Sequence, residues 1–400
     1  MAAKKLRILL ITSTYPRWAG DSTPGFVEGF ARTLTSENIA VTVIAPHSKG
    51  AAIHERQGDI DVRRYRYFLP ESEQTIAYDG GGVSKIKATP VYALKLLCLI
   101  ASQFFVSLYE ILSKKIDIIN AHWLIPQGFI GVILKMLTGR KLVITVHGSD
   151  VLTLNGGLLR KVKRFTLKHA DKVVVNSSAT LAACQDLYPH RDYALIPMGV
   201  DMDRFAPAPK SKRLIKKHKL RGLTILFVGR LTKEKGLDKL VDAIGLLKNE
   251  KNYTLLVVGE GPEKATIQQQ AVRLGLKSRV VFAGWVPQDK LTEYYTTADI
   301  MVGPSLHEAL GLVFIEAAAC GLPVLATNTG GVKDVVKHDV TGLLIDQPEP
   351  ELIAQELRPI LTKPAALKRL SKNSRAHVVK NYSWQHVGEL YAKLLRSFKA

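Results

Sequence analysis

Two glutamates, Glu308 and Glu316, are the side chains whose type and spacing best suit chemistry. They stand eight positions apart, with Gly311-Leu312 between them. The apolar, alanine-rich run after Gly311 predicts a helix, so the first carboxylate precedes a helix N-terminus and the second lies about one turn inside it. Free backbone N–H groups and partial positive charge at such a terminus suit a diphosphate. Carboxylates beside an anion are suited to accept hydrogen bonds from hydroxyl groups of a ribose or a hexose.

A solvated glutamate next to an ordinary amphipathic helix is the simpler interpretation of this pair, and the spacing alone would favour it. The Gly-Leu pair and the buried strand predicted at Pro323–Ala326 favour a site instead.

Two cations in a glycine-bounded loop form a second candidate group. Arg230 follows the predicted strand Thr224–Val228, and Lys235 directly precedes Gly236. An arginine offers a planar fork to phosphate oxygens, and a lysine supplies a compact charge. A surface ion-pairing role is the alternative, and we expect only that role for Lys233.

These groups and the motifs around them resemble the retaining glycosyltransferases of the GT-B fold, family 4, also called group 1. The motifs, in chain order, are His147-Gly148-Ser149-Asp150, Ile196-Pro197-Met198-Gly199-Val200-Asp201, Phe227–Gly236, Gly259-Glu260-Gly261-Pro262, and the glutamate pair ahead of Cys320-Gly321-Leu322-Pro323-Val324. Each motif is weak alone, but their order makes a specific match over nearly the whole chain. The resemblance implies an α/β GT-B fold, with two Rossmann-like domains facing across a cleft and a C-terminal helix returning to the N-terminal domain.

The resemblance also implies roles for three of the catalytic candidates. Arg230 and Lys235 would hold the donor diphosphate and stabilise it as the leaving group. His147 would contact sugar hydroxyls near the anomeric centre. From their positions ahead of the helix and inside it, we expect Glu308 to face the transferred sugar and Glu316 the ribose. Because no carboxylate is obviously placed as a nucleophile, we expect front-side attack, with the leaving phosphate taking the acceptor proton.

Further donor contacts are expected from backbone groups. The N–H groups of Gly311 and Leu312 would meet the diphosphate, and that of Gly25 the donor phosphate or the acceptor. The family usually has two consecutive glycines at Gly25, where this chain has Pro24-Gly25. Glu260 and Val286 would border the base, although a surface role for Glu260 is an equal alternative. The family reads the base largely through backbone atoms, so UDP- and GDP-linked donors both stay open.

We expect no cofactor beyond the donor and no metal site. No cluster of His, Cys and Asp has metal-ligand spacing in the sequence. The Asp-x-Asp pairs Asp59-Ile60-Asp61 and Asp201-Met202-Asp203 do not follow predicted strands at a convincing site. Cationic side chains would replace a metal.

The domain organisation follows from the length and from two series of apolar strands. A chain of 400 residues with 46% hydrophobic content exceeds one core. Near-continuous Val/Ile/Leu runs alternate with helical segments, which predicts buried parallel sheets wrapped by helices. We expect an acceptor-side domain at 1–204, a nucleotide-sugar domain at 205–383 and a returning helix at 384–400. The apolar run near the N-terminus is interpreted as a first strand, not as a signal peptide.

The net charge of +21 requires an explanation. Residues 1–200 carry 25 Lys/Arg against 15 Asp/Glu, and residues 201–400 carry 31 against 20, so the excess is shared. Such charge usually indicates only a solvated surface. A more specific interpretation is that it attracts an anionic membrane or a phosphate-rich substrate. We expect no nucleic-acid partner, because no nucleic-acid-binding motif accompanies the charge. Three dispersed cysteines favour a reducing cytosol.

The apolar stretch Thr89–Lys115 is long enough to span a bilayer. However, Lys95, Gln103 and Glu110 interrupt it, and the next strand must rejoin the same sheet, so we expect no transmembrane helix. A buried core helix and a membrane-apposed helix remain open alternatives.

Together these features predict a retaining, metal-independent glycosyltransferase that acts on a lipid-linked or polysaccharide precursor. We expect it in the cytoplasm, peripheral on the inner face of the cytoplasmic membrane. The alternatives are a GT-B nucleotide-sugar epimerase or hydrolase, and a soluble transferase on a small-molecule acceptor.

Overall fold

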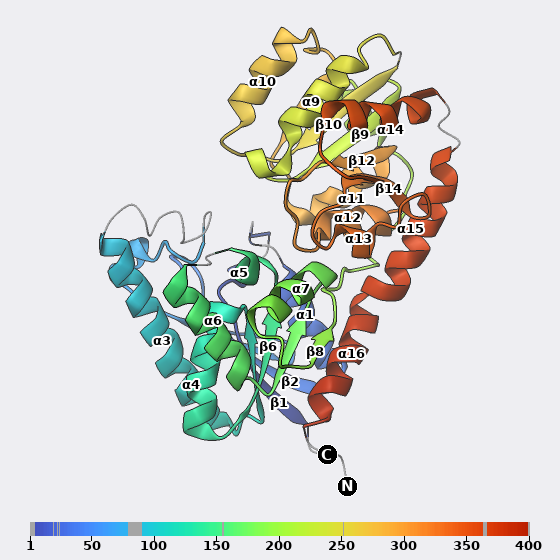
Figure 1. The fold of residues 1–400 in the computed structure, drawn as a ribbon. Coiled ribbons are helices and arrows are strands. Elements are labelled where there is room, and N and C mark those ends of the chain that lie inside the picture. Colours follow the sequence, from blue (N-terminus) through green and yellow to red (C-terminus); the bar gives the residue numbers. More distant parts are fainter. Residues whose placement is uncertain are drawn as a thin grey trace. The chain divides into compact units, whose positions relative to one another are not determined.

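The computed structural model of the chain describes residues 5–18, 20–21, 23, 25–78, 90–153, 156–250, 252–362 and 366–398 (Figure 1). The chain divides into two compact units, Met1–Gly199 with Trp384–Ala400, and Val200–Ser383. The first division falls between Gly199 and Val200 instead of between 204 and 205. Phe205 is buried in the second unit, where its ring centroid lies 6.0 Å from that of Tyr295.

The first unit is built on a sheet whose described strands run in the order β3-β4-β2-β1-β5-β6-β7-β8. All neighbours pair in parallel except β3 and β4, which form an antiparallel hairpin at one edge. The central strand β1 has one exposed residue, Arg7, which is the pattern of a strand covered on both faces. The strands are β1 Leu6–Ile11, β2 Ile39–Pro46, β3 His54–Gln57, β4 Ile60–Tyr65, β5 Ile118–His122, β6 Lys141–Val146, β7 Lys172–Val175 and β8 Tyr193–Leu195.

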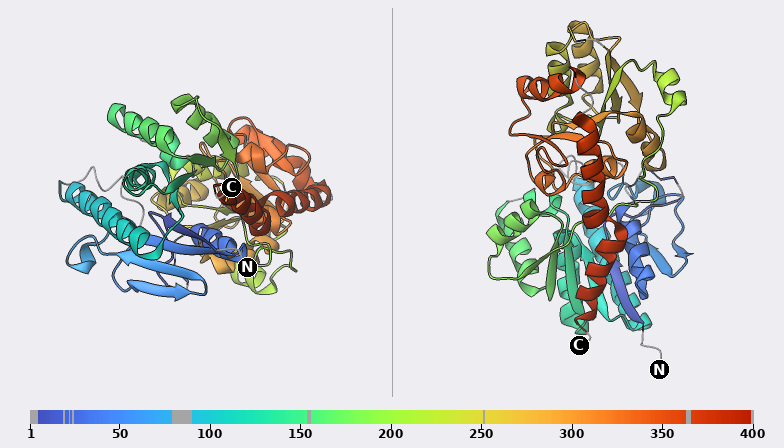
Figure 2. Two further views of the ribbon diagram at one scale, coloured as in Figure 1. Left: turned by 90° about the horizontal axis from the view of Figure 1, so that it is seen from below. Right: turned by 90° about the vertical axis from the view of Figure 1, so that its right-hand side faces the viewer.

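The helices of the first unit include the last helix of the chain. Trp384 begins this helix, α16, and packs so closely on Gly29 and Gly199 that a Cβ on either glycine would lie within 2.7 Å of the indole. Tyr391 donates a hydrogen bond of 3.3 Å to Thr145 Oγ1 in β6. Figure 2 shows α16 lying along the first unit. The helices are α1 Phe26–Ser36, α3 Pro90–Lys114, α4 Phe129–Thr138, α5 Ser149–Leu152, α6 Gly157–His169, α7 Ser178–Leu187 and α16 Trp384–Arg396.

The second unit is built on a fully parallel sheet, whose described strands run in the order β11-β10-β9-β12-β13-β14. An apolar core on this sheet includes Ile225, Leu255 and Val302, all buried. The strands are β9 Leu223–Val228, β10 Tyr253–Val258, β11 Val280–Gly284, β12 Ile300–Gly303, β13 Val324–Thr327 and β14 Gly342–Ile345. The helices are α8 Lys212–His218, α9 Leu237–Leu246, α10 Lys264–Arg273, α11 Gln288–Thr297, α12 Leu312–Ala319, α13 Val332–Val335, α14 Pro350–Thr362 and α15 Ala366–Tyr382.

Helix α3 has the reverse of the usual amphipathic arrangement. The predicted stretch forms one helix, Pro90–Lys114, while Thr89 lies outside the described residues. Its polar residues Lys95, Gln103 and Glu110 are buried. Its exposed face carries large apolar side chains, namely Val91, Leu94, Leu97, Phe105, Tyr109 and Leu112.

By length and composition α3 could cross a membrane, but its neighbours in the fold define its position. It lies between β4 and β5 in the chain, and both strands belong to one sheet. Leu99 and Ile111 join the core on that sheet, although only 22% of the most apolar window of the helix is buried. The helix is therefore neither fully buried nor detached from the sheet.

Candidate functional site

The predicted donor-binding residues follow the strands of the second unit at their carboxyl ends. Strands β9, β10 and β11 succeed one another in one direction, and β12, β13 and β14 in the other, so the order reverses between β9 and β12. Ligands of parallel α/β sheets bind at such a switch point. Arg230 follows β9, and Glu308 and Gly311 follow β12, on the two sides of the reversal.

The structure brings two of these candidates into direct contact. Lys235 Nζ lies 2.6 Å from Glu308 Oε2, and both side chains are partly buried. Gly236 makes this approach possible, because it has φ +65° and a Cβ there would lie 2.1 Å from the carbonyl oxygen of Pro304. The backbone N–H of Leu306 also donates to the backbone carbonyl oxygen of Glu234 at 2.8 Å. The loop after β9 is thereby fixed against the loop after β12.

The predicted helix N-terminus is present at α12. Gly311 precedes the helix in a left-handed conformation, φ +84°, and a Cβ there would lie 2.5 Å from the ring of Phe314. Among the described residues, no acceptor faces the backbone N–H of Gly311 or Leu312. Glu308 is adjacent, since the same Cβ would lie 3.3 Å from its Cγ. The carboxylate of Glu308, the ammonium group of Lys235 and the two free N–H groups of Gly311 and Leu312 therefore lie close together.

Glu316 is held from both sides inside the second unit. It is buried, and its Oε1 accepts from Gln288 Nε2 at 2.7 Å while its Oε2 accepts from the Tyr295 hydroxyl at 2.9 Å. Burial raises the pKa of this carboxyl, against the lowering effect of the two hydrogen bonds. Each carboxylate oxygen can accept a second hydrogen bond, so a hydroxyl of a ligand can still bind.

The remaining candidates of the second unit lie around the same strand ends. Arg230 is exposed after β9. Glu260 follows β10 and pairs with Lys264 at 2.6 Å, with 46% of its side chain exposed. Val286 follows β11, one residue before the cap of α11, the helix that carries Gln288 to Glu316. The positions and contacts of Arg230, Glu260 and Val286 are compatible with binding a ligand and equally with an ordinary surface role.

In the first unit the structure groups His147 with the start of α1. Gly25 precedes α1, and the ring of the next residue, Phe26, lies 5.2 Å from that of His147 between centroids. The ring of Trp123 lies 4.7 Å from that of His147 between centroids, tilted by 41°. His147 is almost fully buried, and this desolvation lowers its pKa to about 3, so the ring is neutral near pH 7. Pro24 lies outside the described residues.

Asp150 anchors the backbone beneath this group. Its Oδ2 accepts from the backbone N–H of Leu124 at 2.6 Å, and its Oδ1 from that of His147 at 3.2 Å. Asn176 Nδ2 donates to the carbonyl oxygen of His147 at 3.2 Å. The backbone of His147 is therefore fixed on both sides.

Sequence reasoning missed three residues that touch the candidates. His122 contacts His147, and Gln288 and Tyr295 hold Glu316. His122 ends β5 as His147 follows β6, so its place at a strand end was a usable signal. The two partners of Glu316 lie on a different helix, which the spacing of residues in the sequence does not reveal.

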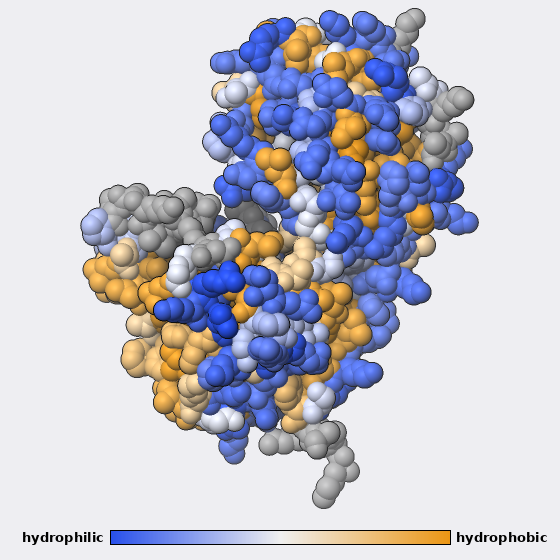
Figure 3. Space-filling view, viewed as in Figure 1, coloured by the Kyte–Doolittle hydropathy of each residue, from blue (hydrophilic) through white to orange (hydrophobic). Residues whose placement is uncertain are grey.

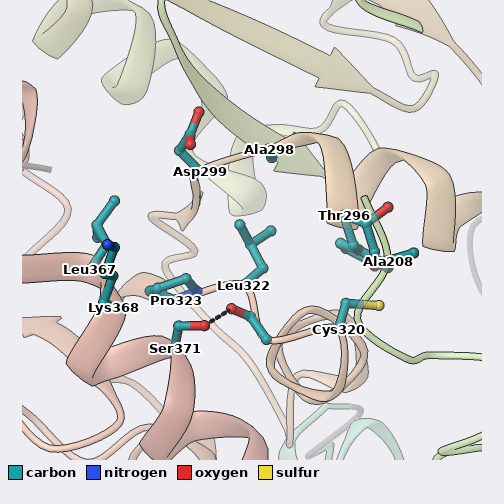
Figure 4. A pocket seen from close by; sticks show the side chains of 12 residues that line it. Ala208, Thr296, Ala298, Asp299, Cys320, Leu322, Pro323, Leu367, Lys368 and Ser371 are labelled. Carbon is teal, nitrogen blue, oxygen red and sulfur yellow. Dashed lines mark hydrogen bonds between the residues drawn. The ribbon is translucent and has the colours of Figure 1, made fainter. Parts of the chain in front are cut away.

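The second unit has a cavity of about 500 Å³ on another side (Figure 4). Asp299 and Pro323 line it, and they precede β12 and β13. The cavity thus lies at the amino ends of these strands, opposite the candidate site. Its wall is closed by Ser371, which donates to the carbonyl oxygen of Gly321 at 2.6 Å. Within the residues that the structure describes, no group of three or more His, Cys, Asp and Glu is arranged to hold a metal ion.

The sequence matches known families over both units. Residues 26–204 match the family described as Glycosyltransferase Family 4, and residues 210–377 match Glycosyl transferases group 1. The GDP-mannose-dependent alpha-(1-6)-phosphatidylinositol monomannoside mannosyltransferase of Mycobacterium tuberculosis is 26% identical over 98% of each chain.

Solved structures show the same fold. The sucrose-phosphate synthase of Thermosynechococcus elongatus superposes with a TM-score of 0.81 over 99% of both chains, at 23% identity. Anabaena HepE in complex with UDP-glucose gives 0.74 over 98% of this chain and all of that one, at 20% identity. The chain therefore belongs to glycosyltransferase family 4, the group 1 glycosyl transferases, has the GT-B fold and uses a nucleotide sugar as its donor.

Proposed function

We propose that this protein moves a sugar from a UDP- or GDP-linked donor to a hydroxyl of a lipid-borne acceptor, with retention of configuration and without a metal ion. The observation that carries the proposal is the Lys235–Glu308 ion pair beside the free N–H groups of Gly311 and Leu312. A nucleoside diphosphate needs positive charge and N–H donors, and its sugar needs a hydroxyl acceptor. This group supplies all three.

In this proposal catalysis consists of stabilising the leaving diphosphate. Arg230 and Lys235 bind its oxygens, and the N-terminus of α12 adds backbone donors. Glu308 accepts from the transferred sugar and holds Lys235 at the phosphate. The acceptor hydroxyl attacks from the face of the leaving group, and its proton passes to the departing phosphate oxygen.

His147, on the first unit, provides a neutral hydrogen-bonding group for the sugar. A charged imidazole would be costly there, because the ring is buried among Phe26 and Trp123. The N–H of Gly25 at the start of α1 adds a donor for the acceptor or for a phosphate oxygen.

The lipid-borne acceptor is supported by an apolar surface on the first unit. The docking surface consists of the exposed apolar residues of three neighbouring helices: Val91, Leu94, Leu97, Phe105, Tyr109 and Leu112 of α3, Met136 and Leu137 of α4, and Leu158, Leu159 and Phe165 of α6. In Figure 3 the hydrophobic residues, coloured orange, gather over α3 and α4. A surface of this kind is expected to contact a partner or a membrane.

Basic residues on α6 favour an anionic membrane as that partner. Lys161, Arg164 and Lys168 are exposed on this helix. Lys163, part of the same basic run in the sequence, is fully buried and donates to the carbonyl oxygen of Thr153 at 2.5 Å, so it does not face a membrane. We therefore place the protein on the cytoplasmic face of the membrane, attached peripherally.

The test is to incubate the protein with radiolabelled UDP- and GDP-sugars, with and without a lipid extract. The proposal expects label to enter the lipid fraction only when a matching donor and the extract are both present. Release of free sugar, or an epimerised nucleotide sugar, without the extract would favour the epimerase or hydrolase alternative. Transfer to water-soluble acceptors with no labelled lipid would favour a soluble transferase.

A further inference from the structure

Two imidazole rings meet at the carboxyl ends of β5 and β6. His122 is fully buried at the end of β5, and His147 follows β6 with 8% of its surface exposed. His147 Nε2 lies 3.1 Å from His122 Nδ1, a hydrogen-bond distance. Aromatic rings enclose the pair, with Phe30 4.9 Å from His122 and Trp123 4.7 Å from His147 between centroids.

We propose that His122 is a positioning residue for glycosyl transfer. Its Nδ1–H donates to Nε2 of His147, which places the proton of the His147 ring on Nδ1. That N–H is then the group that His147 offers to an oxygen of the donor sugar. Only this last step rests on the proposed function; the direction of the bond between the two rings stands without it.

The bond has one donor, because both rings are neutral. Desolvation lowers the pKa of both histidines, and that of His122 is lowered further by its neighbour. Two neutral imidazoles share a single proton in a bond between Nε2 and Nδ1, so the direction of the bond fixes the tautomer of both rings. Asp150 also contacts this pair, because its Oδ1 accepts the backbone N–H of His147.

The other nitrogen of His122 decides the direction. Its Nε2 is fully buried and has no hydrogen-bond partner among the described residues. If His122 accepted at Nδ1, its proton would sit on Nε2 as a buried N–H without an acceptor. Such orphaned donors are rarer in folded proteins than under-satisfied acceptors. The proton of His122 is therefore on Nδ1, directed at His147.

The surroundings of His147 then leave one nitrogen for a ligand. Its backbone N–H is bound by Asp150 and its carbonyl oxygen by Asn176, so the ring is held at its base. Nε2 is occupied by His122. The N–H on Nδ1 remains as the donor that can meet a hydroxyl or phosphate oxygen.

The test is the tautomer of His147 in the complete protein, labelled with ¹⁵N-histidine and read by long-range ¹⁵N–¹H correlation at pH 7.5 without substrate. His147→Gln identifies the signals. The proposal expects the proton of His147 on Nδ1. A proton on Nε2 would overturn it, whatever the activity of the enzyme. An absence of all transferase activity with an Nδ1 proton would reject the proposed function alone.

A pair of variants separates positioning from packing. In His122→Asn the amide N–H can replace Nδ1–H, whereas His122→Phe keeps a ring in the space but removes the donor. We expect the Asn variant to keep the His147 tautomer and turnover within about threefold. The Phe variant removes the donor that fixes the His147 proton on Nδ1, so the ring should populate both tautomers, and kcat should fall roughly tenfold with little change in donor KM, as about 1.4 kcal/mol in the transition state would do. Equal tautomers and equal kcat in the two variants would contradict the proposal.

Discussion

At the residue scale, Glu308 and Glu316 have different environments, so substitutions of the two residues should have different effects. Glu308 holds Lys235 and is partly open, so Glu308→Gln should remove an ion pair and a sugar contact. If the proposed sugar contact tightens in the transition state, turnover should fall by roughly 100-fold or more, with nucleoside diphosphate affinity nearly kept. Steady-state kinetics with calorimetric binding of the diphosphate separates the two effects. Near-normal turnover with weakened affinity would reject this role.

Glu316→Ala should chiefly weaken the binding of the nucleotide. It also leaves the Tyr295 hydroxyl and Gln288 without their buried acceptor, so some loss of thermal stability is expected. Glu316→Gln preserves shape and serves as the control for stability. If the Ala variant binds UDP and GDP as the wild type does, Glu316 has only a structural role.

The two cations should be required for the diphosphate, and a chelator should not matter. Arg230→Ala and Lys235→Ala each lose a charge-assisted contact, which costs roughly 1.5–3 kcal/mol of binding or transition-state free energy. Lys233→Ala, in the same loop and exposed, is the matched control and should have little effect. Rates are compared with and without EDTA. Strict magnesium dependence of the chemical step would contradict the proposed metal-independent mechanism.

The buried histidines should make the first unit sensitive to acid. His147 has a pKa of about 3 in the folded protein and 6.5 when unfolded, so the unfolded state alone binds the proton between these values. Stability is thus complete above pH 6.5 and falls as pH decreases, by up to about 1.4 kcal/mol per pH unit for each such histidine.

Tryptophan fluorescence can follow this unfolding, because Trp18, Trp123 and Trp384 belong to the first unit. Unfolding midpoints at pH 7.5 and 5.0 should differ less in the double variant His122→Asn, His147→Asn than in the wild type. An equal pH dependence in the two proteins would show that these rings do not titrate as described.

At the element scale, most of the fold was predictable, and the exceptions have physical reasons. Buried parallel strands appear in a sequence as continuous Val/Ile/Leu runs. The predicted bounds of the strands that carry the site therefore agree with the structure to within a few residues. The hairpin of β3 and β4 was missed, because His54–Gln57 is polar and Ile60–Tyr65 alternates apolar with charged residues. Its turn at Gly58-Asp59 was a usable signal, with Gly58 at φ +61°.

The candidate site was predictable only in part. The strand-end positions of Arg230 and Glu308 in the second sheet, and of His147 in the first, follow from the sequence, since the loops after the parallel strands of one sheet meet at one edge of that sheet. The partners of these residues do not follow from it. Which polar group faces Glu316, or which ring bonds His147, depends on packing between elements distant in the chain.

Helix α3 could be predicted in length but not in orientation. Composition left a core helix and a membrane-apposed helix equally open. In the structure the buried side of α3 is polar, with Gln103 donating to the carbonyl oxygen of Thr12 at 3.1 Å and Lys95 paired with Glu73 at 2.5 Å. Leu99 and Ile111 are buried beside these polar groups, and the α3 residues of the docking surface are left on the outside.

Vesicle sedimentation tests the docking surface. We expect binding to anionic vesicles and not to neutral ones, released by high salt, because each cation near an anionic leaflet contributes about 1 kcal/mol. Neutralising Lys161, Arg164 and Lys168 together should weaken it. The control neutralises Lys212, Lys216 and Lys217, three exposed lysines on α8 of the second unit.

A second pair of variants tests the apolar residues of the docking surface. Leu97→Gln with Leu112→Gln should lower the bound fraction, since both side chains are largely exposed on α3. Leu246→Gln with Val272→Gln makes a comparable change on the second unit and should not. Equal recovery of the wild type in the supernatant with both vesicle types at low salt would leave the soluble alternative.

At the scale of the whole molecule, the two units divide the work. The side chains expected to bind the diphosphate and the ribose belong to Val200–Ser383, whereas His147 and the backbone N–H of Gly25 belong to the unit that carries the docking surface. We therefore expect His147→Ala to lower turnover while leaving UDP or GDP affinity within about twofold. Lys235→Ala should weaken both. Equal losses of nucleotide affinity in the two variants, measured by calorimetry, would contradict this division.

The proposed function depends most on retention of configuration by front-side attack on a donor held by Arg230, Lys235 and the start of α12. The direct measurement is the anomeric configuration of the product, determined by NMR couplings after transfer in the presence of EDTA and compared with that of the donor. We expect the same configuration in product and donor. An inverted product would contradict the proposed function.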